Sequence, residues 1–340
     1  MAPPFCLNIP IKQGLSEIDN PLKLIGSMRS RFSFRNQDAS DNILIMAAMN
    51  GFSLSRLLVG AGLFLLQGCF TGAFYHPDQV QIETPAHYHL RFEEVFFDSR
   101  DGTSLHGWFV PAIGTPAGTV IHFHGNYGNQ TYSFKQVHWL PAQGFNVFTF
   151  DYRGYGRSEG KPSKRGVYED SVAAIEYIVK RPGIDRNNVF VFGQSLGGAN
   201  AITAVAKNDF PQIRAIVVEG AFSSYRIQAQ DAMTASTREK IGNVPCLSWQ
   251  IWPISFLAVT DSYSPGECVH RVSPIPLLLI HCRPDSIVSY QHSVRLYEAA
   301  KEPKQLWLID GCSHLKVFPA AQPDSGYRQK LVQFFMEHRR

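Results

Sequence analysis

Short apolar runs alternate with longer, periodically apolar stretches from about residue 90 to the end of the chain. Apolar runs of about four to eight residues between turn residues are typical of buried strands. Two opening strands are predicted over 91–98 and 105–111, with Asp101-Gly102 as the turn of a hairpin. The same pattern predicts further strands over 119–123, 146–150, 188–192, 215–219, 276–281 and 305–309.

The stretches between these strands have helical periodicity, and they cover 132–143, 163–180, 196–207, 290–300 and 325–338. Strands that alternate with helices after an opening hairpin predict an α/β fold, with a mostly parallel sheet, helices on both faces and an antiparallel edge. Functional groups of such sheets lie on loops at the carboxyl ends of the strands. No strand is expected between 219 and 276, and the aromatic run there, with Trp249 and Trp252, predicts a small helical cap over about 222–272.

The chain before residue 70 contains an apolar run, 57–66, that is preceded by Arg56. A run of about ten residues is too short to span a bilayer, which takes about 20, but it has the size of a signal-peptide core. The sequence Leu66-Gln67-Gly68-Cys69 resembles the lipobox of bacterial lipoproteins, although Gln67 departs from the small residue usual there. This resemblance implies cleavage before Cys69, a lipid on Cys69 and attachment to a membrane of the bacterial cell envelope.

The same resemblance divides the chain into three parts. Residues 49–68 are expected to be the signal peptide, and 1–48 an extension that is disordered or absent from the native protein, whose start codon would lie later. Residues 69–340 are then expected to form one domain with its cap. The alternative is an uncleaved anchor helix over 52–70.

Composition narrows the class of protein. The 340 residues are 44% hydrophobic and 18% charged, which excludes a disordered or fibrous chain. A net charge of +4 without a run of five basic residues gives no indication of nucleic-acid binding. The six cysteines include no CxxC pair, and His122 and His124 lack neighbouring ligands, so no metal site is expected.

The motif Gly193-Gln194-Ser195-Leu196-Gly197 directly follows a predicted strand and opens a predicted helix. That context is the one required of a nucleophile elbow, in which a strained turn lifts a serine hydroxyl above the sheet. A serine needs a base to take its proton and a third group to orient that base. Asp285 and His314 each follow a late predicted strand, with Asp310 as the rival acid.

At this point the sequence resembles the α/β-hydrolase superfamily over roughly residues 90–340. The run from His281 to Val288 is similar to the family's HGxxDxxV acid loop, with Cys282 in place of Gly, and 311–314 to its catalytic-histidine loop. The loop 124–129, HGNYGN, is similar to that of an esterase-like and depalmitoylase-like branch. The resemblance implies a triad and an oxyanion hole without a cofactor: Ser195, Asp285 and His314, with the amides of Leu196 and of either Asn126 or Tyr127.

Two further features follow from this assignment. The segment 151–158 is also characteristic of the family, and a shaping role rather than a catalytic one is expected for it. The loops that carry Asp285 and His314 must approach one another, so Cys282 and Cys312 are expected to form a disulfide. Cys246 and Cys268 are a second expected pair, at the base of the cap.

The expected activity is hydrolysis of carboxylic esters, with thioesters as a variant, on small-molecule or lipid-like acyl substrates and short or medium acyl chains. The alternatives are a peptidase of the prolyl-aminopeptidase type, which shares these motifs, and a non-catalytic binding lipoprotein. The oligomeric state stays open.

Overall fold

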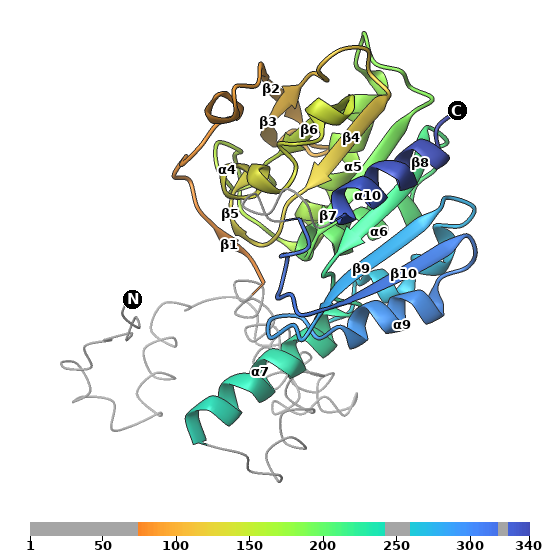
Figure 1. Cartoon of the computed structure of the whole chain (residues 1–340). Coiled ribbons are helices and arrows are strands. Elements are labelled where there is room, and N and C mark those ends of the chain that lie inside the picture. Colours follow the sequence, from red (N-terminus) through yellow and green to blue (C-terminus); the bar gives the residue numbers. More distant parts are fainter. Residues whose placement is uncertain (1–73, 242–258, 319–325) are drawn as a thin grey trace, which may run out of the picture. The chain divides into compact units, whose positions relative to one another are not determined.

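The computed structural model describes residues 74–241, 259–318 and 326–340 (Figure 1). Its contacts divide the chain into Met1–Ala61 and Gly62–Arg340, and every described residue belongs to the second unit. The expected extension, signal peptide and lipidated Cys69 lie outside the described residues. Within the described part, no helix combines the length and the apolar character that crossing a membrane requires.

The centre of the unit is an eight-stranded sheet in the order β10-β9-β8-β7-β4-β6-β3-β2. Strand β3 pairs antiparallel with β2 and with β6, and all other pairs in this sheet are parallel. The hairpin turns at Gly102, whose φ of +84° suits glycine. This is the predicted α/β-hydrolase fold, with strands β2 (Glu93–Asp98), β3 (Ser104–Val110), β4 (Gly118–Phe123), β6 (Phe145–Phe150), β7 (Val189–Gln194), β8 (Ile213–Glu219), β9 (Leu277–Arg283) and β10 (Lys304–Asp310).

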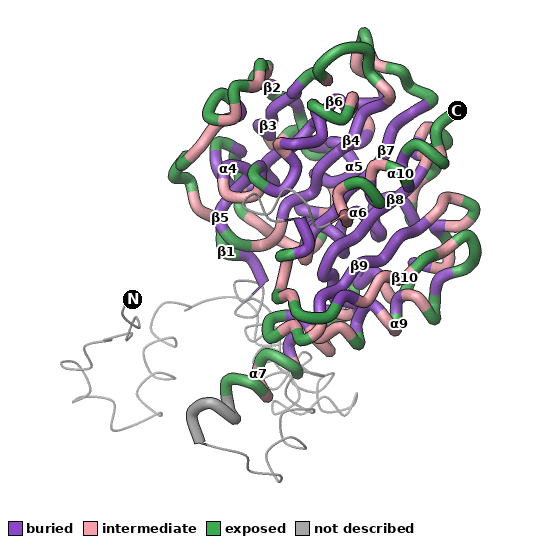
Figure 2. The backbone as a smooth tube through the Cα atoms, viewed as in Figure 1, coloured by how far each residue is buried: buried purple, intermediate pink, exposed green. Residues whose placement is uncertain are grey.

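Helices cover both faces of the sheet, because successive residues of each central strand point to opposite faces. Ile121 and Val191 pack in one apolar cluster with helices α5 (Lys164–Lys180), α6 (Leu196–Ala206) and α9 (Gln291–Ala299). Their neighbours Val120 and Phe190 pack in a second cluster with α10 (Tyr327–Glu337). Figure 2 shows the resulting buried centre, in which the parallel strands run between the two helical layers.

The helix expected over 132–143 is replaced by short turns: α4 (Gln130–Ser133), η2 (Phe134–Gln136) and η3 (Pro141–Gln143). The side chains of Phe134, Val137, Trp139 and Leu140 are all buried. At 100° per residue these four would spread around a helix, and one helix lying on a sheet can bury only one stripe. Burial of all four therefore favours an irregular path, and the prediction was wrong here.

The described part of the expected cap begins with α7 (Tyr225–Ile241). Residues 242–258 lie outside the described part, and the chain continues from Val259 through the turns η5 (Pro265–Glu267) and η6 (Val269–Arg271). Cys268, between these turns, is a free, buried thiol within the cluster that contains α6. Its Sγ donates to Pro265 O at 3.6 Å, and burial raises the pKa of the thiol. Because the structure leaves this thiol free, the expected disulfide to Cys246, a residue outside the described part, is wrong.

Candidate active site

Ser195 lies on a sharp turn between β7 and α6. Its φ of +53° and ψ of −118° are a backbone conformation that non-glycine residues rarely adopt and that costs free energy. The turn is held by Ser195 N, which donates to Glu219 O at 2.8 Å. A Cβ on Gly197 would lie 2.1 Å from Phe123 O, so only glycine permits this close approach of the helix to β4. The geometry is that of the predicted nucleophile elbow.

Asp285 and His314 come from the loops after β9 and β10 and meet at the same edge of the sheet. His314 Nδ1 lies 2.7 Å from Asp285 Oδ2, and the Asp285 side chain is 1% exposed. Asp285 Oδ1 accepts from the N–H groups of Ile287 and Val288, at 2.9 and 3.0 Å. Burial raises the pKa of the Asp285 carboxyl, but its hydrogen bonds outweigh this effect and hold that pKa well below the usual range. The carboxylate is thus ionised and oriented toward the imidazole.

The sequence did not single out His281 for this site. Its Nε2 lies 2.9 Å from Val288 O and 3.2 Å from Asp285 Oδ2, and its Nδ1 lies 2.7 Å from Ser293 Oγ. Because Val288 O can only accept, the His281 Nε2–H donates to it. The signal that could have identified His281 is its place as the first residue of the acid-loop motif.

Asp310, the rival acid, lies elsewhere. Its Oδ2 accepts from Arg283 Nη2 at 2.9 Å, and its side chain is 76% exposed. Asp310 is the last residue of β10, and the partner of its carboxylate is Arg283 rather than His314. Among the described residues, Asp285 is the carboxylate that pairs with His314.

A disulfide joins the two loops that carry Asp285 and His314. Cys282 and Cys312 have a Cα–Cα distance of 5.2 Å and are bonded through their sulfur atoms. Cys282 pairs with Ile309 in the ladder of β9 and β10, so the bond lies just where the two strands end. The structure therefore contains the pairing that the sequence predicted for these two cysteines.

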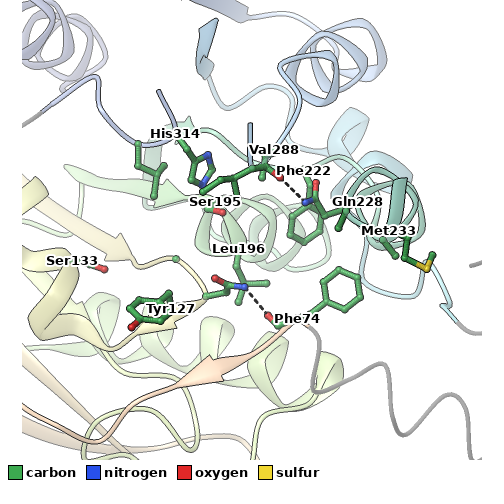
Figure 3. A pocket seen from close by; sticks show the side chains of 16 residues that line it. Phe74, Tyr127, Ser133, Ser195, Leu196, Phe222, Gln228, Met233, Val288 and His314 are labelled. Atoms are coloured by element: carbon green, nitrogen blue, oxygen red, sulfur yellow. Dashed lines mark hydrogen bonds between the residues drawn. The ribbon is translucent and has the colours of Figure 1, made fainter. Parts of the chain in front are cut away.

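A cavity of about 320 Å³ opens in front of Ser195. Figure 3 shows the His314 imidazole beside the Ser195 hydroxyl at one end of this cavity. Most of the wall is apolar, with side chains from distant segments such as Phe74, Phe222 and Met233, and Ser133 and Gln228 add polar groups. Among the described residues that line it, His314 is the only Asp, Glu, His, Lys or Arg. An uncharged acyl group fits such a wall better than a charged one does.

The candidate oxyanion donors also line the cavity. Leu196 is the first residue of α6, and N–H groups in the first turn of a helix have no partner within that helix. Asn126 and Tyr127 lie on the loop after β4, where β5 (Tyr127–Gly128) pairs with β1 (His76–Pro77). All three residues thus line the same cavity as Ser195.

Beneath the elbow lies a buried polar network that sequence reasoning missed. His122 Nε2 lies 3.0 Å from Gln194 Oε1, and Gln194 Nε2 donates to Glu219 Oε2 at 2.7 Å. Glu219 Oε1 accepts from Val317 N at 3.2 Å, and burial raises the pKa of Glu219. This network ties the strand before Ser195 to the loop after His314. A carboxylate at the end of an otherwise apolar strand was the available signal.

The described residues contain no group of three or more His, Cys, Asp or Glu side chains placed to hold a metal ion. Nothing in the arrangement of Ser195, His314 and Asp285 calls for one, since a serine, a base and an acid suffice for acyl transfer.

The chain has relatives in bacteria, fungi and plants. It is 39% identical to the protein YfhR of Escherichia coli K12 over 267 residues. This alignment covers 77% of this chain and 86% of YfhR. The chain is 25% identical over 303 residues to bem46 of Schizosaccharomyces pombe, covering 87% and 94%. The family model described as serine aminopeptidase, S33, matches residues 114–261. The chain belongs to the α/β-hydrolase superfamily.

Solved structures of other α/β hydrolases share the fold of this hydrolase. The esterase Pf2001 of Pyrococcus furiosus superimposes with a TM-score of 0.61 at 21% identity, over 78% of this chain and 98% of the esterase. Acetyl xylan esterase 1 of Thermoanaerobacterium gives a TM-score of 0.54 at 16% identity, over 81% and 93%. At these identities the likeness shows the fold.

Proposed function

We propose that this hydrolase cleaves carboxylic esters through an acyl-enzyme intermediate. Ser195 Oγ attacks the carbonyl carbon while His314 takes the hydroxyl proton, and Asp285 holds the imidazole in the correct tautomer. His314 then gives the proton to the leaving alcohol, and water hydrolyses the acyl-enzyme by the same route in reverse. The observation that carries the proposal is the Asp285–His314 pair beside a serine on a strained elbow.

The negative oxygen of the tetrahedral intermediate needs hydrogen-bond donors. We assign Leu196 N–H as one donor, and the N–H of Asn126 or of Tyr127 as the second. All three residues line the cavity with Ser195.

The cavity wall favours esters over peptides. An aminopeptidase binds the positive charge of a free amino group, for which a carboxylate in the substrate site is the suitable partner. No carboxylate is among the described lining residues. Two acidic residues of the cap region, Asp231 and Asp261, are absent from this lining: Asp231 faces His292 at 3.3 Å, and Asp261 pairs with Arg226 at 3.4 Å. Because the matching family model is described as serine aminopeptidase, aminoacyl substrates are included in the test.

The test is hydrolysis of p-nitrophenyl esters from two to twelve acyl carbons, beside aminoacyl naphthylamides and an acyl thioester. We expect turnover of esters with short or medium chains, loss of turnover in Ser195→Ala, and labelling of the native protein by a fluorophosphonate. Labelling that persists in Ser195→Ala would show that another residue is the nucleophile. Faster turnover of the naphthylamides would replace the ester assignment by a peptidase, and a folded protein that neither labels nor turns over would be a binding protein.

For localisation we propose a lipid anchor at Cys69 in the bacterial cell envelope. The support is the lipobox-like sequence before Cys69 and the short apolar run before it. Mass spectrometry of the mature N-terminus tests the proposal: we expect a diacylglyceryl-modified Cys69, and an intact Met1 peptide in the membrane fraction would favour the uncleaved helix.

A further inference from the structure

Two tyrosines of the segment 151–158 hold the backbone of the loop that carries the candidate oxyanion donors. Tyr152 Oη donates to His124 O at 3.2 Å, and Tyr155 Oη donates to Asn126 O at 2.9 Å. Both tyrosine side chains are fully buried, and burial raises the pKa of each phenol. The two hydroxyl groups therefore stay protonated at every pH at which a hydrolase is assayed, and each remains a donor.

A held carbonyl also fixes the N–H of the next residue, because a trans peptide is planar and its C=O and N–H point in opposite directions. Asn126 O accepts from Tyr155 Oη and also from His76 N at 3.1 Å, so the Tyr127 N–H is directed away from both. Two donors on one carbonyl leave that peptide little freedom to rotate.

The neighbouring peptide is fixed in a similar way. Gly125 O accepts from His124 Nδ1 at 2.7 Å, which directs the Asn126 N–H away from the buried imidazole. His124 is itself held through its carbonyl by Tyr152. The tyrosine contacts at His124 O and Asn126 O thus lie on either side of the peptide that supplies the Asn126 N–H. The orientation of both candidate donors, Asn126 N–H and Tyr127 N–H, is therefore restricted.

We propose that Tyr152 and Tyr155 are positioning residues that keep the oxyanion-hole loop in its donating orientation. The proposal rests on the proposed serine-hydrolase function and deepens it. Neither hydroxyl lines the cavity, so their effect on the reaction passes through the loop backbone rather than through contact with the substrate.

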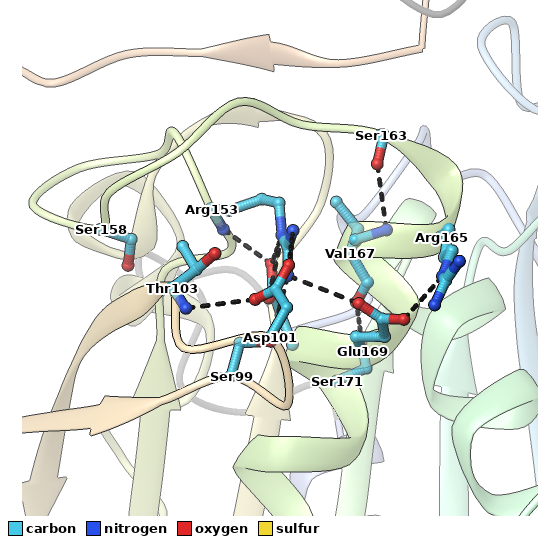
Figure 4. A network of polar contacts seen from close by, with 12 residues as sticks. Ser99, Asp101, Thr103, Arg153, Ser158, Ser163, Arg165, Val167, Glu169 and Ser171 are labelled. Atoms are coloured by element: carbon cyan, nitrogen blue, oxygen red, sulfur yellow. Dashed lines mark hydrogen bonds and ion pairs between the residues drawn. The ribbon is translucent and has the colours of Figure 1, made fainter.

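Arg153, directly after Tyr152, anchors the segment that carries both tyrosines. Arg153 Nη2 donates to Asp170 Oδ1 at 2.8 Å, and Arg153 Nη1 donates to Asp101 Oδ2 at 2.7 Å (Figure 4). Arg153 N also donates to Asp170 Oδ2 at 2.9 Å, so the backbone itself is tied to α5. An anchored segment loses little freedom when its tyrosines hold the loop, which is what a pre-organised oxyanion hole requires.

The test compares Tyr155→Phe and Tyr152→Phe with Tyr168→Phe in the full chain. Each variant loses one tyrosine hydroxyl. Tyr168 lies on α5, and among the described residues its hydroxyl only accepts a hydrogen bond from Asn208 Nδ2, at 3.0 Å. It is therefore the control. Asn126 O keeps its bond from His76 N in Tyr155→Phe, so this variant is expected to fold. Sites are counted by endpoint fluorophosphonate labelling, so that kcat is measured per intact nucleophile.

Losing a whole oxyanion donor costs about 100- to 1,000-fold in kcat, so loosening one should cost about tenfold, with KM changed less than about twofold. We expect this fall, and a similar slowing of the labelling rate, in Tyr155→Phe and Tyr152→Phe but not in Tyr168→Phe. Values of kcat per labelled site that match Tyr168→Phe in both variants would overturn the proposal. A fall in one variant alone would confine the positioning role to that tyrosine. If the native chain itself neither labels nor hydrolyses esters, the proposed function fails instead.

Discussion

His314 Nδ1 lies 2.7 Å from Asp285 Oδ2, although 29 residues separate the two in the chain. Asp310, much nearer in sequence, pairs with Arg283 on the surface. We therefore predict that Asp285→Asn lowers kcat by about 1,000- to 10,000-fold, because an amide there stabilises the wrong imidazole tautomer. Asp310→Asn is the matched control and should stay within about twofold of the native rate. Steady-state kinetics decide, and the reverse order of effects would exchange the two assignments.

The Cys282–Cys312 disulfide joins the loops of the acid and the base. We predict that the double variant Cys282→Ser/Cys312→Ser lowers the free energy of unfolding by about 2–4 kcal/mol. We also expect its kcat to fall, because the Asp285–His314 contact loosens. The same fall should appear when the native protein is reduced with dithiothreitol. The double variant must then be insensitive to dithiothreitol, and a native activity that the reductant leaves unchanged would contradict a role for the bond in holding the triad.

Arg153 and Asp170 form an ion pair in which the Asp170 side chain is 0% exposed. Arg153→Met leaves this carboxylate buried without its partner, so we predict a loss of about 3–5 kcal/mol in the free energy of unfolding. Asp101, the other partner, has a side chain that is 43% exposed, and Asp101→Asn should cost less than about 1 kcal/mol. Urea denaturation of the two variants measures both values. Equal losses would show that burial of Asp170 is not the cause.

The sequence was sufficient to predict where functional residues on the loops after strands would lie. Ser195, Asp285 and His314 each stand after a recognisable apolar run, and the strand edge brings such positions together in any parallel sheet. Sequence alone could not supply the cavity wall, since Phe74, Phe222 and Met233 come from segments whose approach depends on tertiary packing.

Two failures have the same physical origin. The segment after residue 130 has helical periodicity, yet Phe134, Val137, Trp139 and Leu140 are all buried, which one face of a helix does not allow, and the segment forms short turns. Cys268 has a plausible partner by count, yet its side chain points into the core. In both cases the direction of a side chain decides the outcome, and composition and spacing carry no information about that direction.

Lys164, at the start of α5, lies with Nζ 4.3 Å from the centre of the Tyr225 ring and donates to Thr260 O. Burial lowers the pKa of Lys164 to about 8, against about 10.4 for an unfolded lysine. Between these values the unfolded chain holds a proton that the folded chain has released, so the free energy of unfolding should rise from pH 8 to about pH 10. Urea denaturation at pH 7.5, 8.5 and 9.5 should show a smaller rise in Lys164→Met than in the native protein. Lys207→Met, which removes an exposed lysine, is the control, and an unchanged slope in Lys164→Met would contradict the assignment.

The strain at Ser195 predicts a stability difference between two inactive variants. With φ at +53° and ψ at −118°, an alanine keeps the strained conformation of the serine, whereas a glycine adopts it without steric cost. We therefore expect Ser195→Gly to be more stable than Ser195→Ala by about 1 kcal/mol, although glycine loses more chain entropy on folding. Thermal and urea denaturation of the two proteins measure the difference. Ala201→Gly is a comparison inside α6, where the native alanine has helical backbone and the glycine variant should be the less stable by about 1 kcal/mol. Opposite signs at the two positions would locate the strain at the nucleophile, and a Ser195→Gly that is no more stable than Ser195→Ala would mean that the elbow is not strained.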